Sequence, residues 1–180
     1  MEAKTFGDKN IIIRRLSQKD LKNAKKFQGF VNSLIEEGAQ ILFDKKFSLE
    51  EERKWLEEEF KNIKNSRTVF LVAEHEDKVI SIANVDLNKG RQNHTGILGV
   101  SIRKEYRRIG LGTYLIAEIL KLTKKELKPK PKIIRLSVFP TNKPAIGLYK
   151  KFGFKAVATI PKQIQYKGKL IDEIVMLKEL

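Results

Sequence analysis

Apolar positions change their spacing once between residues 97 and 127. The run from Ile97 to Ile102 consists largely of β-branched residues and leucine, which is typical of a short buried strand. From Leu111 onward, apolar residues recur three and four positions apart, as on one face of a helix, until Pro129 and Pro131 end the pattern. The stretch therefore predicts a strand, a turn and a long amphipathic helix.

A second strand and helix follow directly. Apolar and polar residues alternate from Ile134 to Val138, as in a strand with one buried face. A short helix comes next, with Asn142 or Thr141 as its cap and Gly153 at its end. The long helix before this block acts as a crossover, so we expect its strand to lie parallel to the strand over residues 97–102.

The rest of the chain predicts further strands and two helices. A helix begins at Ser17 and ends near Gly38, and Ser48 with Glu51 forms a capping box for another. The remaining strands are expected over Ile11–Ile13, Thr68–Glu74, Lys78–Leu87, Asn93–Ile102, Lys155–Ile160 and Leu170–Leu177. Because the turns between the middle three are too short for a parallel crossover, these strands form an antiparallel meander.

The predicted fold class is α/β (α+β), with a mixed, mainly antiparallel sheet of six to seven strands and helices on both faces. A chain of 180 residues with 41% hydrophobic side chains suits a single domain over residues 1–180. It has no cysteine, no signal-peptide pattern and no apolar run long enough to span a bilayer. We therefore expect a cytoplasmic protein, and the absence of cysteine excludes an acyl-cysteine intermediate.

The turn before the long helix is suited to an anion. Its sequence is Arg107-Arg108-Ile109-Gly110-Leu111-Gly112, and a glycine-containing helix N-terminus offers free N–H groups and partial positive charge to a phosphate. A Walker A motif is excluded because no Gly-Lys-Ser/Thr follows, and the dinucleotide motif fails at Leu115, its third glycine position. The pattern that remains is R-x-x-G-x-G/A.

A second motif lies about thirty residues further along the chain. The pattern N-x-x-A-x-x-L-Y-x-x-x-G-F is matched at Asn142, Ala145, Leu148, Tyr149, Gly153 and Phe154. Both motifs, in this order, resemble those of the GCN5-related N-acetyltransferases, the GNAT family. The resemblance covers nearly the whole chain and implies an N-acetyltransferase that moves an acetyl group from acetyl-CoA directly to a primary amine of a small molecule or peptide.

The resemblance also implies a set of site residues. Val100, Ser101 and Ile102 would hold the pantetheine arm, with Ile102 N–H as an oxyanion donor, and Asn142 would bind the same region. Tyr149 would lie near the sulfur as general acid to the thiolate. The pyrophosphate would be held by Arg107, Arg108, Ile109, Gly110, Leu111, Gly112 and Thr113. No metal is expected.

The sequence leaves several candidates for the general base that deprotonates the amine. Family members that acetylate ribosomal-protein N-termini carry a glutamate where this chain has Ser137, and serine takes no proton at neutral pH. The candidates that remain are Glu74, Asp86 and His94, or a bound water. Deprotonating a lysine-like amine at pH 7 costs roughly 4.6 kcal/mol and an α-amine only about 1.4 kcal/mol, so a weak base favours the α-amine.

The net charge of +15 leaves alternatives open. Most lysines fall on polar helix faces and indicate a solvated surface, whereas the cluster from Arg103 to Arg108 fits the phosphates of coenzyme A. No aromatic-rich nucleic-acid motif accompanies the charge, so nucleic acid is an unlikely partner on sequence grounds. The alternatives are an inactive acetyl-CoA-binding sensor and a basic nucleic-acid-binding module. Neither a membrane partner nor a homodimer is indicated by any residue, although GNAT proteins often form dimers.

Overall fold

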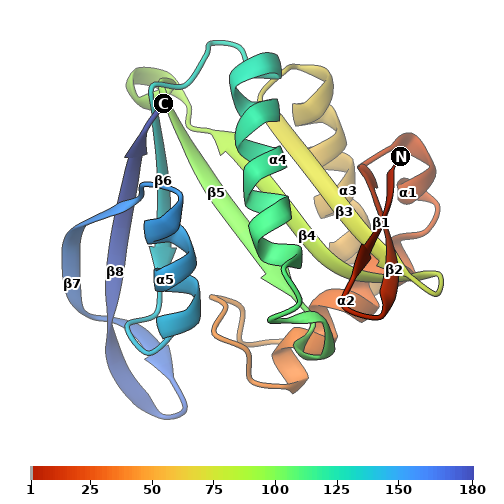
Figure 1. The fold of residues 1–180 in the computed structure, drawn as a ribbon, viewed down its shortest axis with the longest axis horizontal. Helices are drawn as coiled ribbons and strands as arrows, with labels where there is room; N and C mark the ends of the chain where they lie inside the picture. The colour runs from red at the N-terminus through yellow and green to blue at the C-terminus, as the bar shows by residue number, and fades with distance from the viewer. Residues whose placement is uncertain (1) are drawn as a thin grey trace.

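One sheet runs through the whole molecule in the computed structural model, which describes residues 2–180 (Figure 1). Its strands are β1 (Glu2–Phe6), β2 (Lys9–Arg15), β3 (Thr68–His75), β4 (Lys78–Leu87), β5 (Thr95–Ile102), β6 (Ile133–Val138), β7 (Lys155–Tyr166) and β8 (Lys169–Glu179). The helices are α1 (Gln18–Leu21), α2 (Ala24–Glu36), α3 (Leu49–Lys64), α4 (Leu111–Glu126) and α5 (Lys143–Lys151), with short 3₁₀ turns η1 (Gly90–Gln92) and η2 (Lys104–Tyr106).

The eight-stranded sheet has the order β1-β2-β3-β4-β5-β6-β8-β7. All neighbouring strands are antiparallel except β5 and β6, which are parallel. The predicted mixed sheet, the meander and the crossover through α4 are confirmed. The sheet has one strand more than expected, because β1 is polar and largely exposed and only Phe6 is buried. An edge strand of this kind carries no apolar alternation that a sequence pattern could reveal.

Helices cover both faces of the sheet, as predicted. In Figure 1, α4 and α5 lie in front of the sheet, and α2 and α3 lie behind it. The front core centres on Leu115, Ile116 and Ile119 of α4, which are fully buried, and the rear core on Phe27, Leu56 and Phe70. These clusters fix the strands whose ends form the site.

The helix expected from Ser17 to Gly38 is interrupted. Ser17 and Asp20 form the predicted capping box, but Asp20 also binds Arg14 of β2, and the chain turns before α2 begins. The second capping box, Ser48 with Glu51, opens α3 as expected. None of the helices within residues 2–180 is long and apolar enough to cross a membrane.

Candidate functional site

The parallel strands β5 and β6 are paired only at their beginning. Thr95, Gly96 and Ile97 face Ile133, Ile134 and Arg135, and beyond these pairs the two strands separate. β5 continues to Ile102 alongside β4 alone. One edge of the second half of β5 is therefore left without a strand partner.

Backbone alternation shows which groups lie on that free edge. Arg103 N–H donates to the carbonyl of Ile80, and Asn88 N–H donates to the carbonyl of Thr95, so the odd-numbered residues of β5 bond to β4. Even-numbered residues point their N–H and C=O groups the other way. Beyond the last pair, Ile97 with Arg135, the free edge thus presents backbone groups of Val100 and Ile102, both of which the sequence resemblance singled out.

The turn that follows β5 exposes a run of backbone donors. Arg108 and Gly110 have positive φ angles of 64° and 90°, and α4 begins at Leu111. The first backbone bond of the helix is Tyr114 N–H to the carbonyl of Gly110, at 3.1 Å. The N–H groups from residue 108 to residue 113 have no acceptor among residues 2–180, which is the arrangement that binds a phosphate.

Close packing around the turn explains its second glycine. A Cβ atom on Gly112 would lie 3.2 Å from Leu148 Cδ2 and 3.3 Å from Ile102 Cδ1. Those two side chains come from α5 and β5, on either side of the split. Gly7 lies in the turn between β1 and β2, and a Cβ atom there would lie 3.6 Å from Ile109 Cγ2. The turn is thus held between the β1–β2 hairpin and α5, and only a glycine fits at residue 112 without displacing a neighbour.

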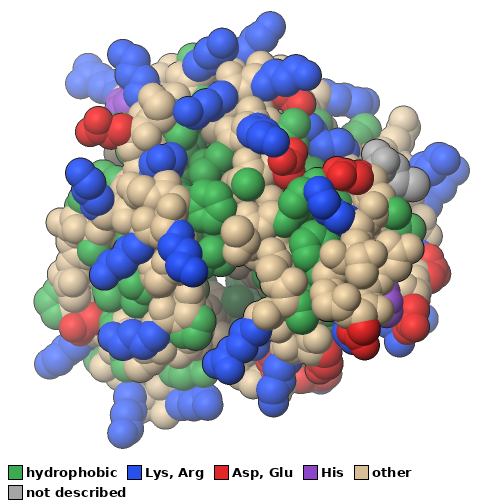
Figure 2. Space-filling view, viewed as in Figure 1, with side chains coloured by type: hydrophobic (Ala, Val, Ile, Leu, Met, Phe, Trp, Pro, Cys, Tyr) green, Lys and Arg blue, Asp and Glu red, His purple; other side chains and the backbone are tan. Residues whose placement is uncertain are grey.

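The two arginines of the turn lie in different surroundings. Arg107 Nε donates to the carbonyl of Ile102 at 2.8 Å, and its guanidinium also forms an ion pair with Glu37 at the end of α2. Arg108 is exposed. Arg107 therefore joins β5 to α2, whereas Arg108 is the guanidinium with no hydrogen bond to another residue within residues 2–180. In Figure 2 the surface is hollowed between α5 and the first turn of α4, with Lys and Arg at the rim.

Tyr149 and Asn142 lie on the other side of the split. Tyr149 is 9% exposed, packs edge-on against Phe154, and its hydroxyl has no hydrogen-bond partner within residues 2–180. Burial raises the pKa of Tyr149 to about 12. Asn142 caps α5, because its Oδ1 accepts from Ala145 N–H at 3.3 Å. This confirms the expected cap and leaves the amide Nδ2 available to a ligand.

A hollow of about 410 Å³ lies between the loop after α2 and the end of β7. Its walls are mainly apolar or neutral and include Ile41, Leu42, Phe43, Ile164 and Tyr166. Leu42 and Phe43 are 67% and 55% exposed at its rim. Large apolar side chains that stay exposed next to a hollow are typical of a ligand-binding surface.

Three contacts fix the loop after α2 around this hollow. Tyr166 Oη donates to the carbonyl of Gly38 at 2.7 Å. Gln40 bonds to Thr141 in the loop between β6 and α5, and Glu37 pairs with Arg107. The loop is thereby tied to the β7–β8 hairpin, the start of α5 and the turn that begins at Arg107.

The sequence-predicted bases do not gather at the split. Glu74 receives two hydrogen bonds of 2.8 Å from Arg14, which also binds Asp20. His94 lies at the opposite edge of the sheet from the turn, where its carbonyl accepts from Lys132 N–H at 2.7 Å. Ser137 is exposed on β6. The base roles of Glu74 and His94 stay predictions.

Asp86, the third candidate, belongs to a buried cluster that the sequence did not reveal. It accepts from Thr68 Oγ1 at 2.6 Å and from Asn84, and it lies beside Glu59 of α3. Burial, with the neighbouring Asp86 carboxyl, raises the pKa of Glu59 to about 8, and burial raises that of Asp86. In the sequence, Glu59 looks like any polar residue on the exposed face of a helix. Only the contact between α3 and β4 in the folded chain shows that it pairs with Asp86.

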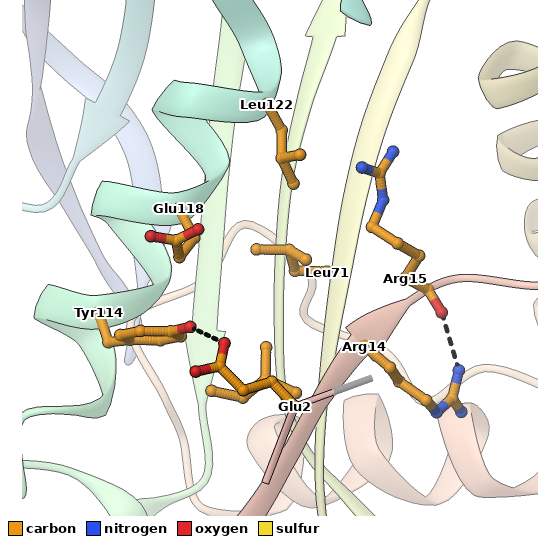
Figure 3. Close-up of a pocket in the computed structure, with 8 residues that line it drawn as sticks. Glu2, Arg14, Arg15, Leu71, Tyr114, Glu118 and Leu122 are labelled. Atoms are coloured by element: carbon orange, nitrogen blue, oxygen red, sulfur yellow. Dashed lines mark hydrogen bonds between the residues drawn. The ribbon is translucent and has the colours of Figure 1, made fainter. Parts of the chain in front are cut away.

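A smaller hollow of about 150 Å³ lies between β2, β3 and α4 and includes Tyr114 of the first turn of α4. Figure 3 shows Tyr114 and Glu2 closing one side of it through a hydrogen bond of 2.6 Å, with Arg14 and Arg15 on the other side. Its other charged side chains are bound to residues outside it, Arg14 to Glu74 and Asp20, Arg15 to Glu126, and Glu118 to Lys121. It offers no run of free donors like that at the turn.

The site as a whole consists of a split between parallel strands, a free strand edge and an anion-binding helix N-terminus. This combination defines a protein that holds a long phosphorylated ligand along its sheet. The chain belongs to the acetyltransferase (GNAT) family, whose model matches residues 35–154. The family suggested by the two sequence motifs is therefore confirmed.

Individual relatives are similar over part of their length. An N-alpha-acetyltransferase of Sulfurisphaera tokodaii is 29% identical over 108 residues, covering 55% of this chain and 64% of the relative. The L-amino acid N-acetyltransferase AaaT of Escherichia coli is 28% identical over 109 residues, covering 60% and 66%. The chain thus spans a little under two thirds of each of these relatives.

Solved structures share the fold over nearly the whole chain. A GNAT-family acetyltransferase from Streptococcus pneumoniae has a TM-score of 0.81 at 24% identity and covers 94% of this chain and 99% of that one. The protein yncA from Salmonella typhimurium, solved with its cofactor acetyl-CoA, has a TM-score of 0.78 at 17% identity and covers 94% of both chains. At these identities the likeness establishes the fold.

Proposed function

We propose that this protein transfers an acetyl group from acetyl-CoA to the α-amine of an amino acid or of a peptide N-terminus. The observation that carries the proposal is the continuity of the free β5 edge with the run of N–H donors from residue 108 to residue 113. An extended amide-containing arm that ends in a diphosphate matches both parts at once. Acetyl-CoA has this chemistry.

The residues around the split fit this cofactor. The N–H groups from residue 108 to residue 113 would hold the diphosphate, with Arg108 beside them. Val100 N–H and C=O, together with Ile102 N–H, would pair with the amides of the pantetheine arm, because the Ile102 carbonyl already accepts from Arg107. The Nδ2 of Asn142 would contribute from the facing side. The cofactor supplies an acetyl thioester, whose C–S bond is exchanged for a C–N bond to the amine.

Tyr149 is suited to protonate the departing thiolate. Its raised pKa keeps the phenol protonated at neutral pH, and its hydroxyl is not committed to another residue within residues 2–180. A proton donor is needed on the side of the split from which the sulfur leaves, and α5 places Tyr149 on that side. Ile102 N–H, on the facing strand, is a donor for the oxygen of the thioester carbonyl.

The acceptor would enter from the hollow behind the loop after α2. Its walls are apolar or neutral apart from Asp44 and Lys167, and they favour an uncharged or apolar side chain over a highly charged one. An α-amine, with a pKa near 8, is uncharged at pH 7 roughly two hundred times more often than a lysine amine with a pKa near 10.4. One relative is named an N-alpha-acetyltransferase and another an L-amino acid N-acetyltransferase, which supports the same acceptor.

An acceptor panel tests the proposal. The protein and acetyl-CoA would be incubated with free amino acids, with peptides bearing a free N-terminus, and with the same peptides blocked at the N-terminus but carrying an internal lysine. We expect thiol release with apolar amino acids or free N-termini and at least about tenfold less with blocked peptides. Faster turnover of the blocked lysine peptides would contradict the proposed acceptor.

A further inference from the structure

Three segments far apart in the sequence meet at the edge of the sheet that lies opposite the phosphate-binding turn. Lys128 N–H donates to the carbonyl of Ser66, and Lys132 N–H donates to the carbonyl of His94. These bonds join the loop from α4 to β6 to the end of α3 and to the turn between β4 and β5. β3, β5 and β6 all begin at this edge, so their C-terminal ends and the acetyl-CoA site lie at the other edge.

The side chains that gather there are almost all cationic. The exposed members, here called the basic edge, are Lys64, Lys89, Arg91, Lys124, Lys125, Lys128, Lys130 and Lys132. Within the part of the chain that the structure describes, none of them has an ion-pair partner. Figure 2 shows Lys and Arg along the corresponding upper margin of the molecule.

Acidic groups near the basic edge are fewer than its eight cations. In the same segments the carboxylates are Glu58, Glu126, Glu179 and the buried pair Glu59 and Asp86. Glu126 is bound by Arg15 at 2.7 Å and faces β2 instead. Like charges gathered at one edge repel one another in the isolated protein, and an anionic partner relieves the repulsion. The coenzyme A phosphates cannot serve, because their site is at the opposite edge.

We propose that the basic edge binds the phosphate backbone of a double-stranded nucleic acid. The large exposed apolar side chains, such as Phe43 and Val157, all lie elsewhere, so the edge lacks the apolar anchors of a protein–protein interface. Among residues 2–180 the edge exposes the imidazole of His94, and the half-buried ring of Phe60 lies under Lys64, so it offers no row of rings on which successive unpaired bases could stack. A group of cations that lacks both apolar anchors and stacking rings is suited to the regularly spaced phosphates of a duplex, which it would bind without regard to base sequence. The proposal is independent of the acetyl-transfer function.

A salt titration with matched charge variants tests it. Duplexes of about 16 base pairs, one RNA and one DNA of the same sequence, would be titrated with the parent, with Lys128→Gln/Lys130→Gln/Lys132→Gln, and with the control Lys25→Gln/Lys78→Gln/Lys169→Gln. The control removes the same charge from exposed residues outside the basic edge. Each lost phosphate contact lowers the slope of log K against log salt by about 0.9, so we expect a reduction of up to about 2.7 in the first variant alone.

The outcomes separate the alternatives. Binding of either duplex near 150 mM salt, weakened at least about tenfold in the basic-edge variant and little in the control, supports the proposal, and the better of the two duplexes identifies the nucleic acid. Equal weakening in both variants would overturn it, because the attraction would then come from net charge alone. Absence of duplex binding at this salt, or tighter binding of poly-glutamate of equal charge, would overturn it too.

Discussion

Arg107 and Glu37 form an ion pair that joins the phosphate-binding turn to the end of α2. Because Arg107 also binds the carbonyl of Ile102, one guanidinium connects the free strand edge, the turn and the loop around the acceptor hollow. The proposed acetyl-CoA site and the proposed acceptor site therefore share this guanidinium. Binding of one substrate should restrict the motion of the residues that bind the other.

Glu37→Gln tests that link. Arg107 is partly exposed, so loss of the ion pair should cost no more than about 1 kcal/mol of unfolding free energy. We expect the KM values for acetyl-CoA and for the amine to rise together, by roughly two- to tenfold, because both loops lose the same restraint. Steady-state kinetics would measure this, with Lys54→Gln, which breaks the exposed Lys54–Glu50 pair on α3, as the control. A change in neither KM would show that the pair has no part in the site.

Tyr149→Phe removes the proposed proton donor and little else. The ring keeps its packing against Phe154, and the lost hydroxyl has no partner within residues 2–180. We expect kcat to fall about 10²- to 10³-fold, with the affinity for acetyl-CoA within about twofold of the parent. Tyr106→Phe, which loses a hydroxyl bonded to His75 instead, should retain its activity. Unchanged turnover in Tyr149→Phe would exclude the role of general acid.

Glu59 should make the fold less stable as the pH rises. Its pKa is raised from 4.5 to about 8 in the folded state, so the folded protein binds more protons than the unfolded chain across that range, and the unfolding free energy falls with increasing pH. One oxygen of the buried Glu59 carboxyl has no hydrogen-bond partner within residues 2–180, which adds to the cost of ionisation. Glu59→Gln should remove this dependence.

Denaturant unfolding at pH 5 and pH 8 measures the effect. We expect the parent to lose on the order of 2–4 kcal/mol relative to Glu59→Gln between these two pH values. Glu57→Gln, an exposed position on the same helix, should follow the parent. If the difference between the parent and Glu59→Gln is the same at both pH values, Glu59 does not ionise over this range.

The sequence predicted the parts of the molecule that are encoded locally. The strand, turn and helix from Ile97 to Glu126 carry a change of apolar period and two glycines, and the cap at Asn142 follows from residue type. β1 escaped prediction because it is a polar edge strand whose partner, β2, supplies the buried side chains. Elements that depend on a neighbour leave little trace in their own sequence.

Long-range contacts were beyond a reading of the sequence for the same reason. The pairing of Glu59 with Asp86, the binding of Glu74 by Arg14, and the distance of His94 from the turn all arise when separate segments meet. In the sequence, the lysines of the basic edge are likewise not distinguished from the many other lysines of the chain. The tertiary fold decides whether such groups are solvated, paired or concentrated on one edge.

Calorimetric titration with acetyl-CoA tests the central claim most directly. It would be carried out on the parent, on Gly112→Asp at the crowded turn, and on Gly147→Asp, where a Cβ atom has no neighbour within 4 Å. We predict micromolar binding by the parent and by Gly147→Asp and at least about a hundredfold loss in Gly112→Asp, because a side chain and a negative charge would enter the diphosphate site. Absence of binding by the parent, or equal binding by all three proteins, would contradict the account.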